Sequence, residues 1–320
     1  MKLPDNHCNA PAGLHSCPQP GKFAMTNRGG TPMSHAPHPD MAPILAEMRA
    51  APVLDYAAIG LPQARAMFDL SARAWNTPMP EMEGHDATLA GVPCRVLRPS
   101  ASGPVVIFAH GGGWTFGSPA THERAGRLIA EAADAQVVLP HYRLAPEHAC
   151  PAALDDVAAV AGCFAGRRLV LLGDSAGANI ALGAALSGVR AALLTLIYGC
   201  FAPVFDTASH RDLGDGSFGL STGRMRWFWD NWQGAAHDPR AAPLHADLAG
   251  LPPVHLLAAG LDCLRDDSML MAGRLAAAGV PCRLDCVPGV THGFLQMSSR
   301  LAPARDAIAA IGAEIRRVAG

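Results

Sequence analysis

A serine stands between small residues in the run Gly173, Asp174, Ser175, Ala176 and Gly177. The preceding stretch, Arg168 to Leu172, has the composition of a buried strand, and Ala178 to Leu186 has that of an apolar, Ala-rich helix. The spacing therefore predicts that Ser175 lies on the tight strand-to-helix turn called a nucleophile elbow, where flanking glycines let the serine oxygen point out over a sheet. The alternative is an ordinary Gly-rich turn in which Ser175 caps a helix and Asp174 is solvated.

Three consecutive glycines follow another apolar run upstream, in the order His110, Gly111, Gly112, Gly113 and Trp114. Residues without side chains let backbone N–H groups approach a substrate carbonyl and stabilise the oxyanion that forms on it. We expect Gly112 and Gly113 to form this oxyanion hole together with the N–H of Ala176, the residue after the serine. The alternatives are a flexible Gly-rich loop and a metal-binding role for His110.

An acid and a histidine follow the serine in the chain order that such a triad requires. Asp262 comes after the apolar run Val254 to Ala258, and His292 comes after the next expected strand. His292 would take the proton of Ser175 during attack on a carbonyl, and Asp262 would orient His292. Asp266 and Asp267 compete for the acid role, but the first turn of a helix explains their position better.

Short apolar runs alternate with longer helical stretches over most of the chain, which predicts a mostly parallel sheet with helices on both faces. Strands are expected near Arg95 to Leu97, Val105 to Ala109, Gln136 to Leu139, Leu169 to Leu172, Ala192 to Ile197, Val254 to Ala258 and Cys282 to Cys286. The spacing of apolar residues also predicts helices between Met41 and Trp75. Residues 199–251 break the rhythm with Gly-rich loops and clustered aromatic residues, so they are expected to leave the sheet.

The first 40 residues carry Asn, Gly, Pro and His without periodicity, which predicts a disordered tail. His7, Cys8, His15 and Cys17 lie in this tail, but their spacing matches no common zinc module. Met33 and Met41 offer alternative translation starts. We therefore expect the folded part to begin near residue 41, and no metal to be bound.

Composition excludes several other classes of protein. The net charge of −2 provides no basic field for nucleic acid. The longest apolar runs fall far short of the roughly 20 residues of a membrane span, and the polar N-terminus has no secretory signal. The nine cysteines lack regular spacing. Together these features predict a cytoplasmic protein with free thiols, no nucleic-acid partner and no membrane span.

Taken together, these runs resemble the hormone-sensitive-lipase family of α/β-hydrolase esterases. The resemblance covers most of residues 90–300. The matching runs are His110 to Trp114, Tyr142 to Glu147, Gly173 to Gly177, Asp262 with Leu264 to Asp266, and His292 to Phe294. The chain departs from the family at Cys263, where proline is frequent, and at Ala178, where a further glycine is frequent. Neither departure touches a reacting group.

The resemblance implies an α/β-hydrolase core over residues 81–198 and 252–320, with a helical cap built from residues 41–80 and 199–251. It implies a serine carboxylesterase acting on short acyl esters, with a small-molecule ester as substrate and no cofactor, and a homodimer formed through the last strand and its helix. The triad would be Ser175, Asp262 and His292. An amidase or deacetylase would use the same triad, and plant gibberellin receptors of this fold family have lost catalysis altogether.

Aromatic residues near the expected site are candidates for substrate contact. They are Trp114, Phe218, Trp227 and Trp229. The helical spacing of the last two, within the run that also holds Phe228 and Trp232, suits a cap helix packed on the core equally well.

Overall fold

The computed structural model describes residues 35–52, 56–98, 102–233 and 238–319. In chain order these residues form α1 (Met41–Ala50), α2 (Tyr56–Ile59), α3 (Leu61–Trp75), β1 (Gly84–Leu89), β2 (Val92–Leu97), β3 (Val105–Ala109), α4 (Pro119–Ala133), β4 (Gln136–Pro140), α5 (Ala152–Gly162), β5 (Leu169–Asp174), α6 (Ala176–Leu186), β6 (Leu193–Ile197), α7 (Ala208–Leu213), α8 (Thr222–Trp232), the 3-10 helix η1 (Pro243–His245), β7 (Val254–Leu261), α9 (Arg265–Ala277), β8 (Cys282–Thr291), the 3-10 helix η2 (Phe294–Met297) and α10 (Ala302–Ala319).

The eight strands form one sheet in the order β1-β2-β4-β3-β5-β6-β7-β8. The neighbours from β4 to β8 in this order pair in parallel, whereas β2 pairs antiparallel with both β1 and β4. Strands β3 and β5 are buried along their whole length, as expected for the centre of a sheet that is covered on both faces. The predicted α/β-hydrolase architecture is therefore confirmed.

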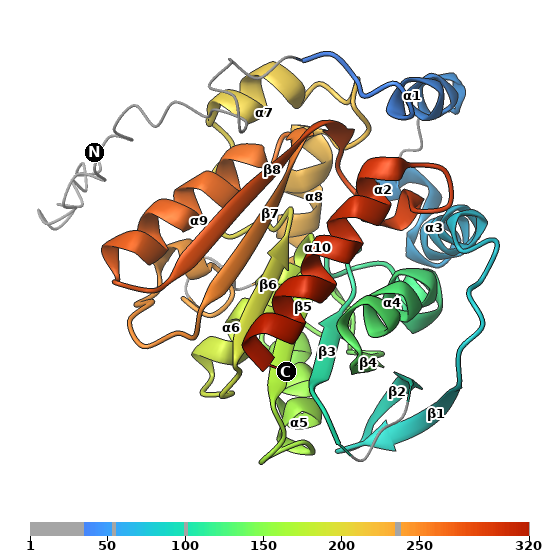
Figure 1. The fold of residues 1–320 in the computed structure, drawn as a ribbon. Coiled ribbons are helices and arrows are strands. Elements are labelled where there is room, and N and C mark those ends of the chain that lie inside the picture. The colour runs from blue at the N-terminus through green and yellow to red at the C-terminus, as the bar shows by residue number, and fades with distance from the viewer. Residues whose placement is uncertain (1–34, 53–55, 99–101, 234–237, 320) are drawn as a thin grey trace, which may run out of the picture.

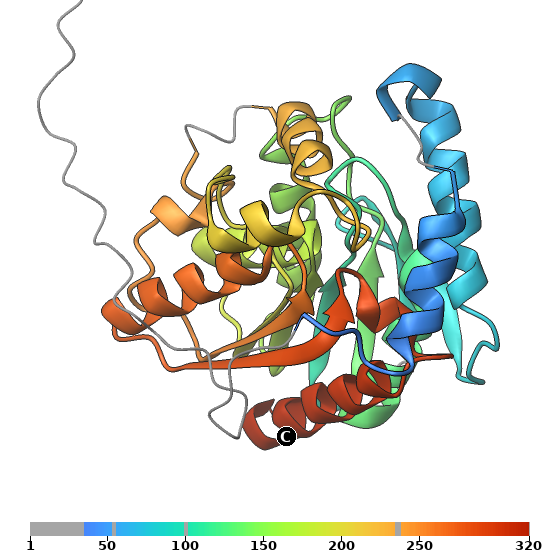
Figure 2. The ribbon, with the colours of Figure 1, turned by 90° about the horizontal axis from the view of Figure 1, so that it is seen from above.

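Helices cover both faces of this sheet (Figure 1). One apolar core lies between the sheet and helices α4 and α10, and a second lies between the sheet and helices α5, α6 and α9. Figure 2, a view from above, places α1 and α3 together at one side of the molecule. Helices α7 and α8 lie near the end of the sheet where β7 and β8 end (Figure 1).

Four strands end at residues predicted to be functional. His110 follows β3, Ser175 follows β5, Asp262 follows β7 and His292 follows β8. In the register of the sheet, Ala109 pairs with Gly173 and Leu261 pairs with Thr291. Because parallel strands end at the same edge, the sheet brings these four residues to one side of the molecule.

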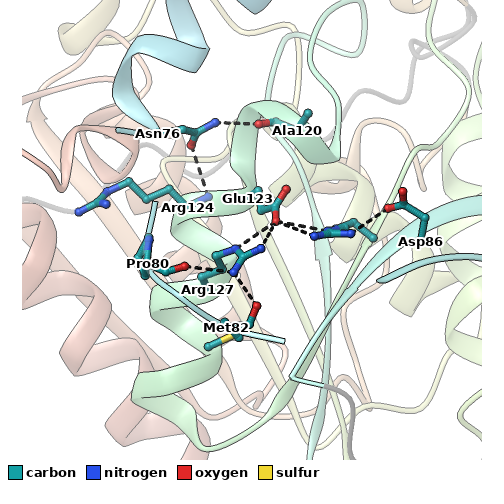
Figure 3. A network of polar contacts seen from close by, with 9 residues as sticks. Asn76, Pro80, Met82, Asp86, Ala120, Glu123, Arg124 and Arg127 are labelled. Atoms are coloured by element: carbon teal, nitrogen blue, oxygen red, sulfur yellow. Dashed lines mark hydrogen bonds and ion pairs between the residues drawn. The ribbon is translucent and has the colours of Figure 1, made fainter. Parts of the chain in front are cut away.

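The segment that links α3 to β1 is tied to α4 by polar contacts (Figure 3). Arg127 donates to the carbonyls of Pro80 and Met82, and it also donates twice to one carboxylate oxygen of Glu123, at 3.0 and 2.6 Å. At the start of the segment, the side chain of Asn76 donates to the Ala120 carbonyl at 2.7 Å. These contacts fix the place where the N-terminal helices join the core.

All seven predicted strands are present, as β2 to β8, and the helices predicted between Met41 and Trp75 are present as α1 to α3. Strand β1 was not predicted. It is an edge strand of exposed and half-buried residues, and it turns into β2 through Ala90 and Gly91, which both have positive φ. This is the two-residue turn geometry typical of a hairpin.

The predicted tail lies mostly outside the described residues, because residues 1–34, including His7, Cys8, His15, Cys17 and Met33, are not among them. Its last residues contact the core. The N–H of His38 donates to the carbonyl of Gly289, and Asp40 accepts from the N–H of Ala302. No helix in the described ranges is long and apolar enough to cross a membrane.

Candidate active site

Ser175 occupies the turn between β5 and α6 with φ 57° and ψ −123°, a conformation that is strained for a residue with a side chain. The flanking glycines make this turn sterically feasible. A Cβ at Gly173 would lie 2.1 Å from the carbonyl oxygen of Gly177, and a Cβ at Gly177 would lie 2.0 Å from that of Ala109. Side chains at either position would therefore push the elbow away from the sheet.

His292 joins Ser175 to Asp262. Its Nε2 lies 2.9 Å from Ser175 Oγ, and its Nδ1 lies 2.7 Å from Asp262 Oδ2. The carboxylate can only accept, so Nδ1 carries the proton and Nε2 is left to accept from the serine hydroxyl. Asp262 is buried, and its second oxygen accepts the N–H of Leu264 at 3.0 Å. The structure thus places the three predicted triad residues in the geometry of a nucleophile, a base and an orienting acid.

The two competing acids point elsewhere. Asp266 accepts the N–H of Ser209 at 2.8 Å, and Asp267 accepts the N–H of Phe201 at 3.4 Å. Both belong to the first turn of α9, as predicted. Burial, together with the nearby charge of Asp262, raises the pKa of Asp267 well above its ordinary value, which favours its neutral form.

The glycine loop after β3 has a backbone that only glycine accommodates easily. Gly112 has φ 129° and Gly113 has φ 59°. A Cβ at Gly112 would lie 2.2 Å from the carbonyl oxygen of Phe116, so the chain folds tightly on itself there. Ala176, the third predicted donor, is the first residue of α6, where backbone N–H groups have no partner within the helix.

A buried carboxylate beside the serine holds the glycine loop, and the sequence did not reveal this role. Asp174 accepts the N–H of Gly111 at 2.8 Å and the hydroxyl of Tyr198 at 3.2 Å, and it lies 3.3 Å from Nε2 of His122. Burial alone would raise the pKa of Asp174, but the charge and hydrogen bond of His122 and the N–H of Gly111 outweigh it, so the pKa is lowered. Asp174 is therefore not the solvated residue of an ordinary turn.

His110 is fully buried rather than available to a ligand. Burial, reinforced by the charge of His122, lowers the pKa of His110 to about 3, so its ring is neutral. The ring stacks on Tyr142 at a centroid distance of 4.2 Å. Within the part of the chain that the structure describes, no group of three or more His, Cys, Asp or Glu side chains could hold a metal ion.

The four aromatic residues proposed for substrate contact lie in two different settings. Trp114 has no exposed surface and packs against Trp229 and Trp232, with ring centroids 4.6 and 5.1 Å away. Trp227 is half-buried beside Phe116, and Phe218 is half-buried below Arg49. A substrate role for these residues stays a prediction.

Phe228, from the same aromatic run, packs against the glycine loop. A Cβ added to Gly113 would fall 2.2 to 2.4 Å from three atoms of the Phe228 ring. The ring is thus packed directly on the backbone of a predicted oxyanion donor. Its place in an aromatic run was the only signal in the sequence.

Comparison with known proteins identifies the family of the chain. Residues 106–296 match the model of a family described as having the alpha/beta hydrolase fold. The chain is 34% identical to the carboxylic ester hydrolase LipN of Mycobacterium tuberculosis over 80% of this chain and 77% of that protein. It is 33% identical to an acetyl-hydrolase of Streptomyces hygroscopicus over 70% of this chain and 79% of that protein.

A solved structure extends the similarity to the whole fold. An esterase from the bacterial hormone-sensitive lipase family superposes with a TM-score of 0.81 at 26% identity, covering 89% of this chain and all (100%) of that one. The chain belongs to the hormone-sensitive-lipase family of α/β-hydrolases and is a carboxylic ester hydrolase.

Proposed function

We propose that this enzyme hydrolyses short-chain acyl esters through an acyl-enzyme formed on Ser175, with Asp262 and His292 as its other catalytic residues. The observation that carries the proposal is the position of His292, which lies within 2.9 Å of the serine oxygen and within 2.7 Å of the aspartate. An imidazole held at this distance on both sides can move a proton without reorienting.

In the first half of the reaction, Oγ of Ser175 attacks the ester carbonyl while Nε2 of His292 takes the hydroxyl proton. Asp262 stabilises the resulting imidazolium through its 2.7 Å contact with Nδ1. The tetrahedral intermediate then collapses, and His292 returns the proton to the leaving alkoxide. In the second half, His292 removes a proton from water as the water attacks the acyl group. The second tetrahedral intermediate then collapses, His292 returns the proton to Oγ of Ser175, and the acid is released.

The negative oxygen of both tetrahedral intermediates needs donors that are already in place. We assign this role to the N–H groups of Gly112, Gly113 and Ala176. The positive φ of both glycines and the helix-terminal position of Ala176 support the assignment. No metal or cofactor is required by this mechanism.

The test is hydrolysis of a chromogenic acetate or butyrate ester by the Ser175→Ala variant. We expect kcat to fall by about 10⁶-fold, because the acyl-enzyme can no longer form. Ser187→Ala is a matched control. Ser175 immediately precedes helix α6 and Ser187 immediately follows it, and the hydroxyl of Ser187 donates to the carbonyl of Gly183. Activity that survives in Ser175→Ala would contradict the proposal.

The proposed preference for short acyl groups rests on two observations. The acetyl-hydrolase relative is named for a two-carbon acyl group. In addition, the buried rings of Trp229 and Trp232 pack on Trp114, and Phe228 packs on Gly113, and we expect this aromatic cluster to limit the room for a long acyl chain. An ester series from acetate to long chains tests the preference, and a maximum at long chains would refute it.

The same triad could cleave an amide, so an amidase or deacetylase is the second candidate. The name of the acetyl-hydrolase relative gives the acyl group that is removed but not whether the bond is an ester or an amide, so that relative is compatible with both activities. Paired ester and anilide substrates with the same acyl group separate the two activities. A receptor that binds without turnover is disfavoured because the hydrogen-bonded chain through Ser175, His292 and Asp262 is complete.

We further propose that residues 41–80 and 199–251 act together as a cap over the site. Helices α3 and α8 support this, since both place aromatic or charged residues against the glycine loop. Phe218, Trp227, Trp114 and Trp229 remain our candidates for substrate contact, with the half-buried Phe218 and Trp227 the most accessible. Alanine substitution of Trp227 should change KM more than kcat.

Two wider properties belong to the proposal as well. We propose that two copies of the chain form a homodimer through the edge strand β8 and helix α10. Analytical ultracentrifugation, which measures the mass of the particle in solution, tests this proposal. We also propose a cytoplasmic location, supported by seven described cysteines that are all free thiols, and fractionation of the source cells tests that.

A further inference from the structure

One arginine of the N-terminal helices reaches across to the glycine loop. Arg65, on α3, donates from Nε to the carbonyl of Thr115 at 2.9 Å and from Nη2 to the carbonyl of Ala145 at 3.1 Å. It also makes two hydrogen bonds to the carboxylate of Glu147, at 2.8 and 2.7 Å. All these contacts join residues 50 to 82 positions apart in the sequence.

Thr115 belongs to the turn that carries the proposed oxyanion donors. The carbonyl of Gly112 accepts the N–H groups of Thr115 and Phe116, at 3.2 and 2.8 Å. Displacement of Thr115 would therefore displace Gly112 as well. Arg65 holds this turn from α3 through the carbonyl of Thr115.

Aromatic packing holds the same turn from the same direction. The ring of Phe116 lies 5.0 Å from that of Tyr56 on α2 and 5.4 Å from that of Phe68 on α3. From α8, the ring of Phe228 covers Gly113. From the sheet, Asp174 at the end of β5 accepts the N–H of Gly111.

We propose that Arg65 is a positioning residue for the oxyanion hole, so that the N-terminal helices take part in transition-state stabilisation instead of merely covering the site. The planar guanidinium suits this task, because its rigid fork can hold a carboxylate and two carbonyls at once. The inference rests on the proposed function of Gly112 and Gly113. A misplacement of the donors by about 1 Å is enough to cost on the order of 100-fold in rate.

The chain offers a matched control for a variant at Arg65. Arg127 makes the same kinds of contact as Arg65 but with other partners: two hydrogen bonds to one glutamate, and one hydrogen bond to each of two backbone carbonyls (Figure 3). Its carbonyl partners, Pro80 and Met82, lie in the linker before β1. Replacing either arginine with methionine removes a comparable network, but only one of the two networks includes the glycine loop.

The experiment compares Arg65→Met with Arg127→Met. Active sites are first counted by burst titration with an organophosphate, so that kcat refers to folded enzyme only, and thermal unfolding is recorded for both variants. We expect kcat of Arg65→Met to be about 10- to 100-fold below that of Arg127→Met, with KM within about twofold. The inhibition constant of a trifluoromethyl ketone, whose adduct places an oxyanion in the hole, should rise by the same factor as kcat/KM falls.

Equal kcat values for the two variants, or a change in KM alone with the inhibition constant unchanged, would overturn the inference. Ser175→Ala is assayed beside them. If that variant is inactive while Arg65→Met matches Arg127→Met, the inference fails and the proposed function stands. If Ser175→Ala remains active, the proposed function fails first, and the role assigned to Arg65 fails with it.

Discussion

A methyl group added to Gly113 tests how tightly the proposed oxyanion hole is built. In Gly113→Ala the new Cβ would lie 2.2 to 2.4 Å from the Phe228 ring, whereas ordinary contacts begin at 3.4 Å. Either the ring or the loop must therefore move by about 1 Å, and a shift of that size in a reacting group can cost about 100-fold in rate. The positive φ of 59° adds a conformational cost of about 1–2 kcal/mol to stability.

A second glycine separates the two effects. Gly279 also has a positive φ, 71°, but a Cβ there would meet nothing within 4 Å. Gly279→Ala should lose about the same 1–2 kcal/mol of unfolding free energy in a urea titration, yet keep wild-type kcat. The assay is turnover of a butyrate ester per titrated active site. If kcat of Gly113→Ala lies within threefold of that of Gly279→Ala, the contact between Gly113 and Phe228 does not set the position of the Gly113 N–H.

Two further predictions concern charge. Asp262→Asn should lower kcat by about 10⁴-fold with little change in KM, because an amide can stabilise the wrong tautomer of His292; steady-state kinetics decide it, and a loss below tenfold would argue for another acid. His110 binds no proton in the folded state until the pH falls to about 3, whereas the unfolded chain binds one near its ordinary pKa of 6.5. Stability should therefore fall as the pH drops from 6.5, by up to about 1.4 kcal/mol per pH unit from this group. Urea unfolding of wild type and His110→Gln between pH 6.5 and 4.5 should show converging curves, and parallel curves would contradict the assignment.

Local sequence was sufficient to predict the elbow and the order of the functional residues. Gly173 and Gly177 lie two positions from Ser175, so the close approaches that demand glycine are encoded within five residues. Asp262 and His292 could be placed because each follows an apolar run, and the carboxyl ends of parallel strands meet at one edge. These inferences needed the direction of the strands but not their packing.

Contacts between distant elements could not be predicted in this way. Arg65 is one of several arginines on the N-terminal helices, and nothing near it in the chain indicates that it bonds Thr115. Tyr198 likewise follows β6, and no motif in the sequence indicates that it bonds Asp174. Strand β1 was not predicted because His85 and Asp86 interrupt its apolar pattern. It is a strand because its backbone pairs with β2, and none of its residues is buried.

The proposed mechanism depends above all on a covalent bond to one oxygen. The most direct measurement is the reaction of the intact enzyme with a fluorophosphonate, followed by proteolysis and mass spectrometry of the labelled peptide. We expect one adduct per chain, located on Ser175, and a loss of esterase activity in proportion to labelling. Inactivation with Ser175 unmodified, or complete modification of Ser175 with esterase activity retained, would contradict it.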